Sequence, residues 1–145
     1  MNQVAVTMRE RVEALQLQVL AQPQYEPPTD HLFHGGLYCR KVEQAEGSLV
    51  VGKVHLKEHL FVLLAGTMLI TSGGEAEEMT APRVLPSMPG TKRVLFALTD
   101  AVYMTVHRTD NTTIAAVEDE VVEPDPTSLF TVGNKLKLKE LPWHS

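Results

Sequence analysis

The chain has 145 residues, a formal net charge of −5 and a hydrophobic content of 43%, which fits one domain with a single core. The acidic balance argues against a nucleic-acid surface, and no apolar run reaches membrane-spanning length. The N-terminus lacks the order of charged then apolar residues that is typical of a signal peptide, and a single cysteine excludes an internal disulfide.

Residues 1–28 predict an amphipathic helix followed by a proline-rich linker. Apolar residues recur at three- and four-residue spacing, as on one face of a helix, and Pro23 ends the pattern. The apolar face must cover either its own barrel or a neighbouring subunit, and the position of the helix outside the β region favours the neighbouring subunit. The residues of that face are Met8, Val12, Leu15 and Val19.

Residues 29–123 predict an all-β domain. After the linker and a turn at residues 31–36, short apolar or alternating segments are separated by turn signals. About eight short strands of this kind indicate a sandwich or barrel. We expect the strands at residues 37–42, 49–54, 60–64, 67–71, 76–80, 83–85, 92–97 and 101–107.

The last part of the chain predicts a polar segment followed by an arm. Residues 111–126 are polar and then acidic, which favours a solvated tail, with a short strand at Val121–Val122 as the alternative. Residues 124–145 form a predicted C-terminal arm in which Lys and Leu alternate. An arm with one apolar face can pack on its own barrel or on a partner. Its interface candidates are Leu136, Leu138 and Trp143.

The segment Gly52–Gly66 holds two histidines, His55 and His59, ahead of the most apolar run of the chain. In an extended chain, residues two apart share a face, so His55, Lys57 and His59 would point the same way. In a helix the same residues spell H-x-x-E-H, a zinc motif of inverted metallopeptidases with Glu58 as the general base. The β-branched, glycine-interrupted approach to His55 and the lack of an N-cap favour the extended form.

A metal site at this pair needs a third ligand. His107, His31 and His34 are the candidates, and imidazole ligands suit Zn, Ni, Cu or Fe. The alternative is that the histidines form hydrogen bonds at the mouth of the barrel. We expect no cofactor, with a divalent transition metal such as Zn, Ni or Fe as the alternative.

A second candidate site follows the turn Pro89–Gly90, where Lys92 and Arg93 could bind an anionic ligand. The alternative for these cations is a salt bridge to Glu58 or Asp100.

The region from Gly52 to His107 resembles a cupin. The first cupin motif has glycine, two histidines, a glutamate and glycine, and the second has a proline–glycine turn followed by a histidine. Here His59 occupies the place of the glutamate, seven residues before Gly66, and Lys92–Arg93 occupy the place of the last histidine. The resemblance implies an all-β, cupin-type double-stranded β-helix (jelly-roll) barrel, here with an N-terminal amphipathic helix and a C-terminal arm, and an incomplete metal set.

A narrower resemblance covers residues 30–123. The runs H-x-F-x-x-G-x-Y-x-R from His31, V-G-K-x-H from Val51 and P-G-T-K-R from Pro89 are similar to a group of small proteins of tailed bacteriophages and prophages. These are described as cupin-like or structural proteins. The resemblance implies a virion component (decoration, neck or tail) that acts through homo-oligomerisation and contacts with other virion proteins, located in the virion and, during assembly, in the host cytoplasm.

Two other functions remain open at this point. One is a metal-dependent cupin enzyme that acts on a small molecule, and the other is a small-ligand-binding module that acts on host pathways. Neither direct nucleic-acid binding nor a membrane location is expected.

Overall fold

The structure is a computed structural model that describes residues 27–71, 75–124, 130–131 and 135–136. The predicted N-terminal helix lies outside these residues. Of the predicted C-terminal interface, only the backbone of Leu136 is described. The interface candidates outside the described residues are Met8, Val12, Leu15, Val19, Leu138 and Trp143.

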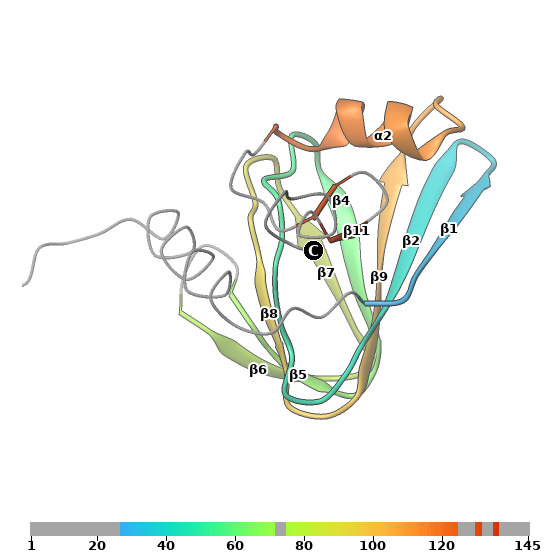
Figure 1. The fold of residues 1–145 in the computed structure, drawn as a ribbon. Helices are drawn as coiled ribbons and strands as arrows, with labels where there is room; N and C mark the ends of the chain where they lie inside the picture. The colour runs from blue at the N-terminus through green and yellow to red at the C-terminus, as the bar shows by residue number, and fades with distance from the viewer. Residues whose placement is uncertain (1–26, 72–74, 125–129, 132–134, 137–145) are drawn as a thin grey trace, which may run out of the picture.

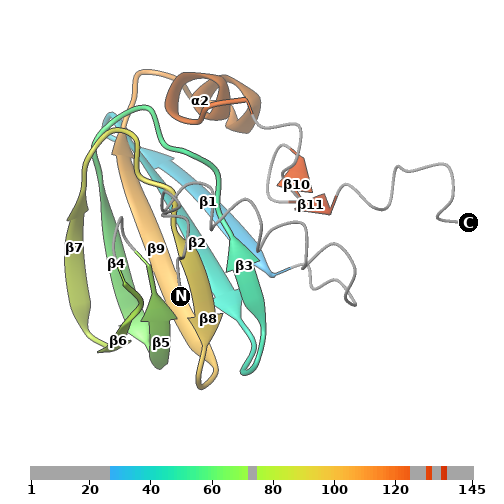
Figure 2. The ribbon, with the colours of Figure 1, turned by 90° about the vertical axis from the view of Figure 1, so that its left-hand side faces the viewer.

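Two antiparallel sheets face each other and enclose the core (Figures 1 and 2). One has the strand order β1-β2-β9-β4-β7 and the other β3-β8-β5-β6. The first comprises β1 (Thr29–His34), β2 (Leu37–Gln44), β4 (His59–Ala65), β7 (Arg83–Ser87) and β9 (Ala101–Arg108). The second comprises β3 (Leu49–Val51), β5 (Thr67–Ile70), β6 (Glu77–Thr80) and β8 (Val94–Ala97). A separate pair is formed by β10 (Phe130–Thr131) and β11 (Lys135–Leu136).

Alternation along the strands decides which side chains face the interior. In β9, Tyr103, Thr105 and His107 are buried, while the residues between them are partly exposed. In the neighbouring strand β4, His59 and Phe61 are buried in the same way. Because successive side chains of a strand point to opposite faces, polar and aromatic groups are arranged in layers inside the barrel.

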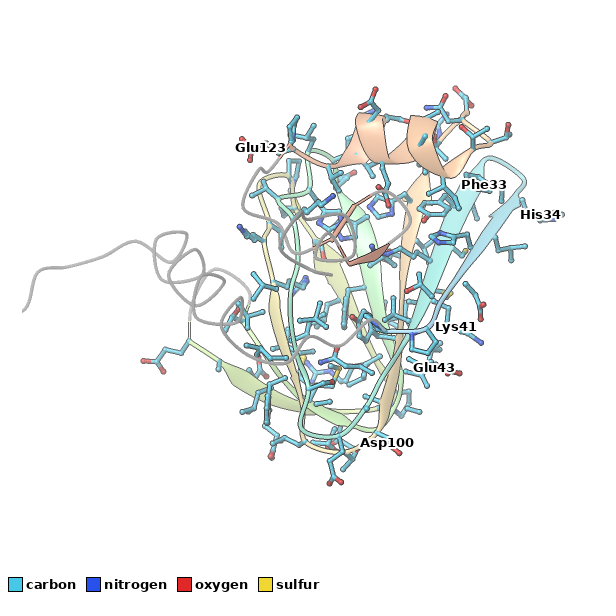
Figure 3. All side chains as sticks on the ribbon, in the orientation of Figure 1. Phe33, His34, Lys41, Glu43, Asp100 and Glu123 are labelled. Carbon is cyan, nitrogen blue, oxygen red and sulfur yellow. The ribbon has the colours of Figure 1, made fainter. Side chains whose placement is uncertain are left out.

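The hydrophobic core fills the end of the barrel away from α2 (Ile114–Val121). Residues from both sheets contribute, as expected for two packed sheets. Asp100 lies at this far end in Figure 3, in the turn before β9. The core consists of Val42, Val50, Phe61, Leu63, Met68, Ile70, Met79, Leu95, Ala97, Ala101 and Tyr103.

The predicted solvated tail is wrong in its central part, because α2 spans Ile114–Val121 and lies across one end of the barrel (Figure 1). Thr113 caps the helix, and its side chain accepts a hydrogen bond from the backbone N–H of Ala116. Val117 and Val121, four residues apart, are buried and pack against Tyr38. Among its acidic residues, this region therefore contains two helix signals, an N-cap residue and a pair of apolar residues four positions apart.

The predicted turn at residues 31–36 is also wrong in part. Strand β1 covers Thr29–His34 and pairs along its whole length with β2. Gly35 and Gly36 both have positive φ, 59° and 79°, which is the backbone of a two-residue hairpin turn. The turn is therefore shorter than predicted, and the residues before it form an edge strand.

Among the described residues, no helix is both long and apolar enough to cross a membrane.

Candidate functional site

Three histidines from separate segments meet at the end of the barrel that α2 covers. His59 begins β4, His107 lies near the end of β9, and His55 lies in the loop after β3. The ring centroids of His59 and His107 are 4.4 Å apart, those of His55 and His59 4.3 Å, and those of His55 and His107 5.4 Å. Of the three residues predicted as a possible third ligand, the structure brings His107 to the pair.

The other two candidates lie elsewhere. The Nδ1 atom of His31 is 2.6 Å from the hydroxyl of Tyr38, and His34 is exposed at the end of β1 (Figure 3). The helical H-x-x-E-H interpretation is wrong, because the residues between His55 and His59 are bent or irregular and a strand begins at His59. Lys57 does not share a face with the histidines; its side chain is exposed and contacts Glu120.

The backbone holds His55 from two sides. Its N–H donates to the carbonyl of Thr91 at 2.9 Å, and its carbonyl accepts from the N–H of Gly90 at 2.7 Å. On the other side it forms an isolated β-bridge with Val122, which follows α2. The flanking hydrogen bonds run from the Leu56 N–H to the Val121 carbonyl at 2.7 Å and from the Glu123 N–H to the Val54 carbonyl at 2.8 Å. The position of His55 thus depends on the docking of the helix.

His59 and His107 each have a ring nitrogen available as a ligand. The Nδ1 atom of His59 lies 3.2 Å from the carbonyl oxygen of Lys57, which can only accept, so Nδ1 carries the proton and Nε2 has a lone pair. His107 is buried, and among the described residues neither of its ring nitrogens has a hydrogen-bond partner. A buried imidazole without partners is uncommon and calls for a role.

The electrostatics of the site keep the three imidazoles neutral. Burial is the main reason that the pKa of His107 falls to about 3, and His59 and Arg40 lower it further. Burial, followed by electrostatic competition with the neighbouring His59 for a proton, holds the pKa of His55 well below 6.5. Burial also lowers the pKa of His59, although its contact with the Lys57 backbone opposes this. Neutral imidazole is the form that binds a metal ion.

The three side chains fit a transition-metal ion. One nitrogen from each can be chosen so that all lie within 4.8 Å of one another. Three nitrogens bound to one ion at about 2.1 Å lie roughly 3.4–3.6 Å apart, so the triad must close by about 1 Å to bind one. Three neutral nitrogen donors suit Zn, Ni, Cu or Fe. The unpartnered nitrogens of His107 are the observation that favours this fit over a hydrogen-bonded cluster.

A cavity of about 70 Å³ lies beside the triad, is lined by residues of both sheets and of α2, and has mostly apolar surface. Phe61, Leu95 and Val121 contribute to its apolar wall. The polar groups that line it, besides the histidines, are Arg40, Lys53, Tyr38, Tyr103, Arg93, Thr105 and Glu118. A cavity with largely apolar surface on which polar groups converge is typical of a ligand site.

Of the two cations predicted to bind an anion, Arg93 lines this cavity, and Lys92 is buried without lining it. The predicted salt bridge is not formed for Arg93 in the described part of the chain. Instead its Nη2 donates to Ser87 Oγ, and the guanidinium lies 5.2 Å from the centre of the Phe61 ring. Asp100 accepts a hydrogen bond from the backbone N–H of Glu46.

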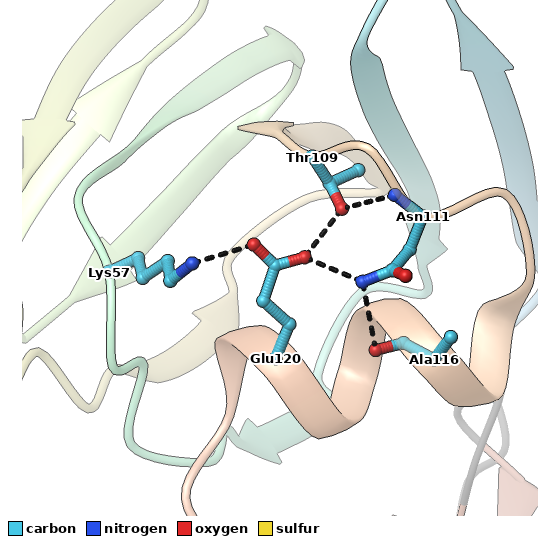
Figure 4. A network of polar contacts seen from close by, with 5 residues as sticks. All are labelled: Lys57, Thr109, Asn111, Ala116 and Glu120. Carbon is cyan, nitrogen blue, oxygen red and sulfur yellow. Dashed lines mark hydrogen bonds and ion pairs between the residues drawn. The ribbon is translucent and has the colours of Figure 1, made fainter.

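A polar network fixes α2 over the site (Figure 4). Lys57 Nζ donates to Glu120 Oε2 at 2.6 Å, and Thr109 Oγ1 and Asn111 Nδ2 donate to Oε1. These donors, Lys57 first, lower the pKa of Glu120 to about 2. The acidic run that suggested a solvated tail thus contains one carboxylate with a structural role.

Comparison with known proteins identifies the architecture. No protein-family model and no curated protein matches the chain. Among solved structures, a cupin superfamily protein from Desulfitobacterium hafniense matches 61% of this chain and 83% of its own, with a TM-score of 0.53 and 13% identity. The fold is a cupin fold.

Two further solved structures show the same likeness. KdgF from Halomonas sp. covers 62% of this chain and 86% of its own, with a TM-score of 0.53 and 12% identity. Salicylate 1,2-dioxygenase from Pseudaminobacter salicylatoxidans covers 77% of this chain, with a TM-score of 0.55 and 13% identity. This chain matches only 34% of the dioxygenase. At such identities the likeness establishes the cupin fold and nothing about substrate.

The predicted all-β cupin barrel is therefore confirmed, while the phage origin and virion role remain predictions. Sequence reasoning did not single out Ser87, Thr105 or Tyr38 as site residues, although Tyr38 stands in the run H-x-F-x-x-G-x-Y-x-R. For Thr105, the alternation of residues 101–107 contained a usable signal, since it places Thr105 on the same face as His107.

Proposed function

We propose that this protein is a metal-dependent cupin that acts on a small molecule in the cavity beside His55, His59 and His107. The observation that carries the proposal is the convergence of three imidazoles within 4.8 Å, one of them with no hydrogen-bond partner for either nitrogen among the described residues. The occurrence of a dioxygenase among the cupin-fold neighbours supports an enzyme. This was the alternative to the virion role, which no described contact favours.

The chain's own groups have distinct parts in such a site. His55, His59 and His107 would hold the ion, and the contact of His59 Nδ1 with the Lys57 carbonyl fixes the ring for binding through Nε2. When bound, a transition metal supplies a Lewis acid that polarises an oxygen of the substrate. The apolar walls, including Phe61, limit water around the reacting groups.

Tyr38 contributes a neutral hydroxyl near the site. Burial raises its pKa to about 12, with Arg40 opposing and Glu118 adding to the shift. It therefore stays protonated at neutral pH and keeps its contact with His31 Nδ1. Its ring lies 6.2 Å from that of His107, centre to centre. Tyr38 thus belongs to the packing that orients His107.

The test is metal content together with molecular mass. The full-length chain is stripped with EDTA, incubated separately with Zn²⁺, Co²⁺, Ni²⁺ and Fe²⁺, desalted, and analysed for metal by elemental analysis and for mass by light scattering. We expect one ion per chain for at least one metal, and a loss of about 100-fold or more in affinity in His59→Ala and His107→Ala, since even outer-shell changes cost 10–100-fold.

The exposed residue His34 provides the matched control. His34→Ala removes an imidazole outside the triad and should leave metal content unchanged. A metal-free oligomer under all four conditions would contradict the proposal and favour the virion role. An equal loss of metal in His34→Ala and His107→Ala would also contradict it.

A further inference from the structure

We propose that Arg93, assisted by Thr105, forms an anion subsite in the cavity, and that the molecule bound beside the triad carries a carboxylate. That this carboxylate belongs to a substrate rests on the proposed function. The binding of the anion itself does not require the ion, so the two can be tested separately.

The first observation is an incompletely satisfied guanidinium. Arg93 is only 7% exposed, and it lines the cavity. Its Nη2 donates to Ser87 Oγ, while Nε and Nη1 have no hydrogen-bond partner among the described residues. Buried guanidinium groups normally have their donors paired. The open N–H groups of Arg93 therefore call for an acceptor, and the cavity it lines is where a ligand could supply one.

The second observation is an unpaired hydroxyl close by. Thr105 is 4% exposed and also lines the cavity, and its Oγ1 has no partner in the described part of the chain. Thr105 lies opposite Phe61 in the pairing of β9 with β4. Because the guanidinium of Arg93 lies over that same ring, both open donors flank Phe61. One bound group could accept from both.

The third observation is the charge of the cavity. Its lining carries three cations, Arg40, Lys53 and Arg93, against one carboxylate, Glu118. The histidines add no charge in their neutral form. An excess of positive charge in a cavity with largely apolar surface favours an anionic ligand. A metal ion held by the triad would increase that excess.

The shape of the group favours a carboxylate over a phosphate. Nη2 has two hydrogens, one on each edge that it shares with Nε or Nη1. Whichever hydrogen reaches Ser87, the other edge keeps two N–H groups, which match the two oxygens of a planar carboxylate. A cavity of about 70 Å³ restricts the ligand to a small molecule, and a carboxylate needs less room than a tetrahedral phosphate.

Calorimetric titration of the EDTA-treated full-length protein tests this directly. The probes are pyruvate, its neutral amide pyruvamide, and inorganic phosphate, each at constant ionic strength. We expect pyruvate to bind, pyruvamide to bind at least about 10-fold more weakly, and Arg93→Met to lose at least about 10-fold in pyruvate affinity. Thr105→Val, which keeps the shape of the side chain, should show a smaller loss.

Arg83→Met is the matched control, because Arg83 is exposed on β7 and does not line the cavity. It should bind pyruvate as the wild type does. No binding of pyruvate to the wild type, equal affinities of the wild type and Arg93→Met, or tighter binding of phosphate than of pyruvate would each overturn the proposal.

Arg93→Lys keeps the charge without the forked geometry and serves if Arg93→Met does not fold. It should lie between the wild type and the methionine variant, and wild-type affinity in Arg93→Lys would refute the forked contact. Metal uptake is measured on the same samples. Pyruvate binding without metal uptake would refute the proposed function and leave the subsite intact, whereas normal metal uptake without pyruvate binding would do the reverse.

Discussion

The side chains of Arg93 and Ser87 join the two sheets of the barrel through a buried hydrogen bond from Nη2 to Oγ. Arg93 precedes β8 in the four-stranded sheet, and Ser87 ends β7 in the five-stranded sheet. Ser87 is also paired in register with His59. The contact therefore connects the candidate anion subsite with a member of the histidine triad.

Ser87→Ala should destabilise the protein by about 1–3 kcal/mol, because it removes the acceptor of a buried, charged donor. Arg93→Met should cost less or even stabilise, since it replaces an incompletely paired buried charge by an apolar chain of similar length. Urea denaturation of both variants measures the difference, with Arg83→Met as a surface control within about 0.5 kcal/mol of the wild type. A larger loss in Arg93→Met than in Ser87→Ala would show that the guanidinium is mainly structural.

The metal-free protein should lose stability as the pH falls below about 6.5. The folded state lowers the pKa of His55, His59 and His107, so below 6.5 the unfolded chain binds protons that the folded chain does not. The contribution of these neutral imidazoles to the free energy of unfolding is complete above pH 6.5. For His107 it is lost progressively as the pH falls from 6.5 to about 3. Each histidine contributes a slope of at most about 1.4 kcal/mol per pH unit.

Urea denaturation at pH 7, 6 and 5 checks this slope in a range where carboxylates of ordinary pKa change little. His107→Gln should make the dependence shallower, whereas His34→Ala should leave it unchanged. Stability that is constant or rises between pH 7 and 5 would be incompatible with neutral, buried imidazoles.

Glu120→Gln should loosen α2 from the barrel. The substitution removes the charge that pairs with Lys57 and weakens the bonds from Thr109 and Asn111. Because the carboxylate is partly exposed, we expect a loss of about 1 kcal/mol. Its stabilising effect in the wild type is complete above pH 4.5 and is lost as the pH falls toward 2. Faster hydrogen exchange in residues 114–121 is the direct readout.

Asp119→Asn is the matched change for Glu120, one position away and exposed. Hydrogen exchange in α2 should remain as in the wild type. Equal acceleration in both variants would mean that the effect arises from helix charge in general and not from the network.

Gly66→Ala should be more destabilising than Gly47→Ala. Both glycines have positive φ, 87° and 80°, so both substitutions strain the backbone by about 1–2 kcal/mol. Only at Gly66 would the added Cβ also meet backbone atoms, with the carbonyl oxygen of Asp100 at 2.2 Å. Thermal unfolding of the two variants gives the comparison, and equal losses would argue against the close approach of the chain at Gly66.

The sequence predicted the barrel well because its strands are short, regularly spaced and separated by Gly, Pro and Asp turns. It placed His55 and His59 as candidate ligands but left three options for the third, because pairing between strands decides which histidine comes close. His107 reaches the triad through the register of β9 with β4, in which Val106 lies opposite Leu60. Register of this kind follows from the whole sheet and not from local spacing.

The sequence was least informative where composition opposed local structure. In residues 111–126 the acidic composition led to the prediction of a solvated tail. The helix signals there, a cap at Thr113 and the apolar pair Val117 and Val121, were given less weight. At Arg93, the charge suggested an anion site or a salt bridge. Its burial and its bond to Ser87 could not be predicted, because both depend on how the two sheets pack.

The bridge between His55 and Val122 couples two parts of the molecule that are far apart in the sequence. A ligand that fixes the position of His55 also fixes the residues that follow α2. By thermodynamic reciprocity, release of the helix must weaken the binding of that ligand. Cutting the chain between α2 and the barrel should therefore weaken ligand binding even though no residue of the triad is removed. Occupancy of the site should in turn protect that segment from proteases.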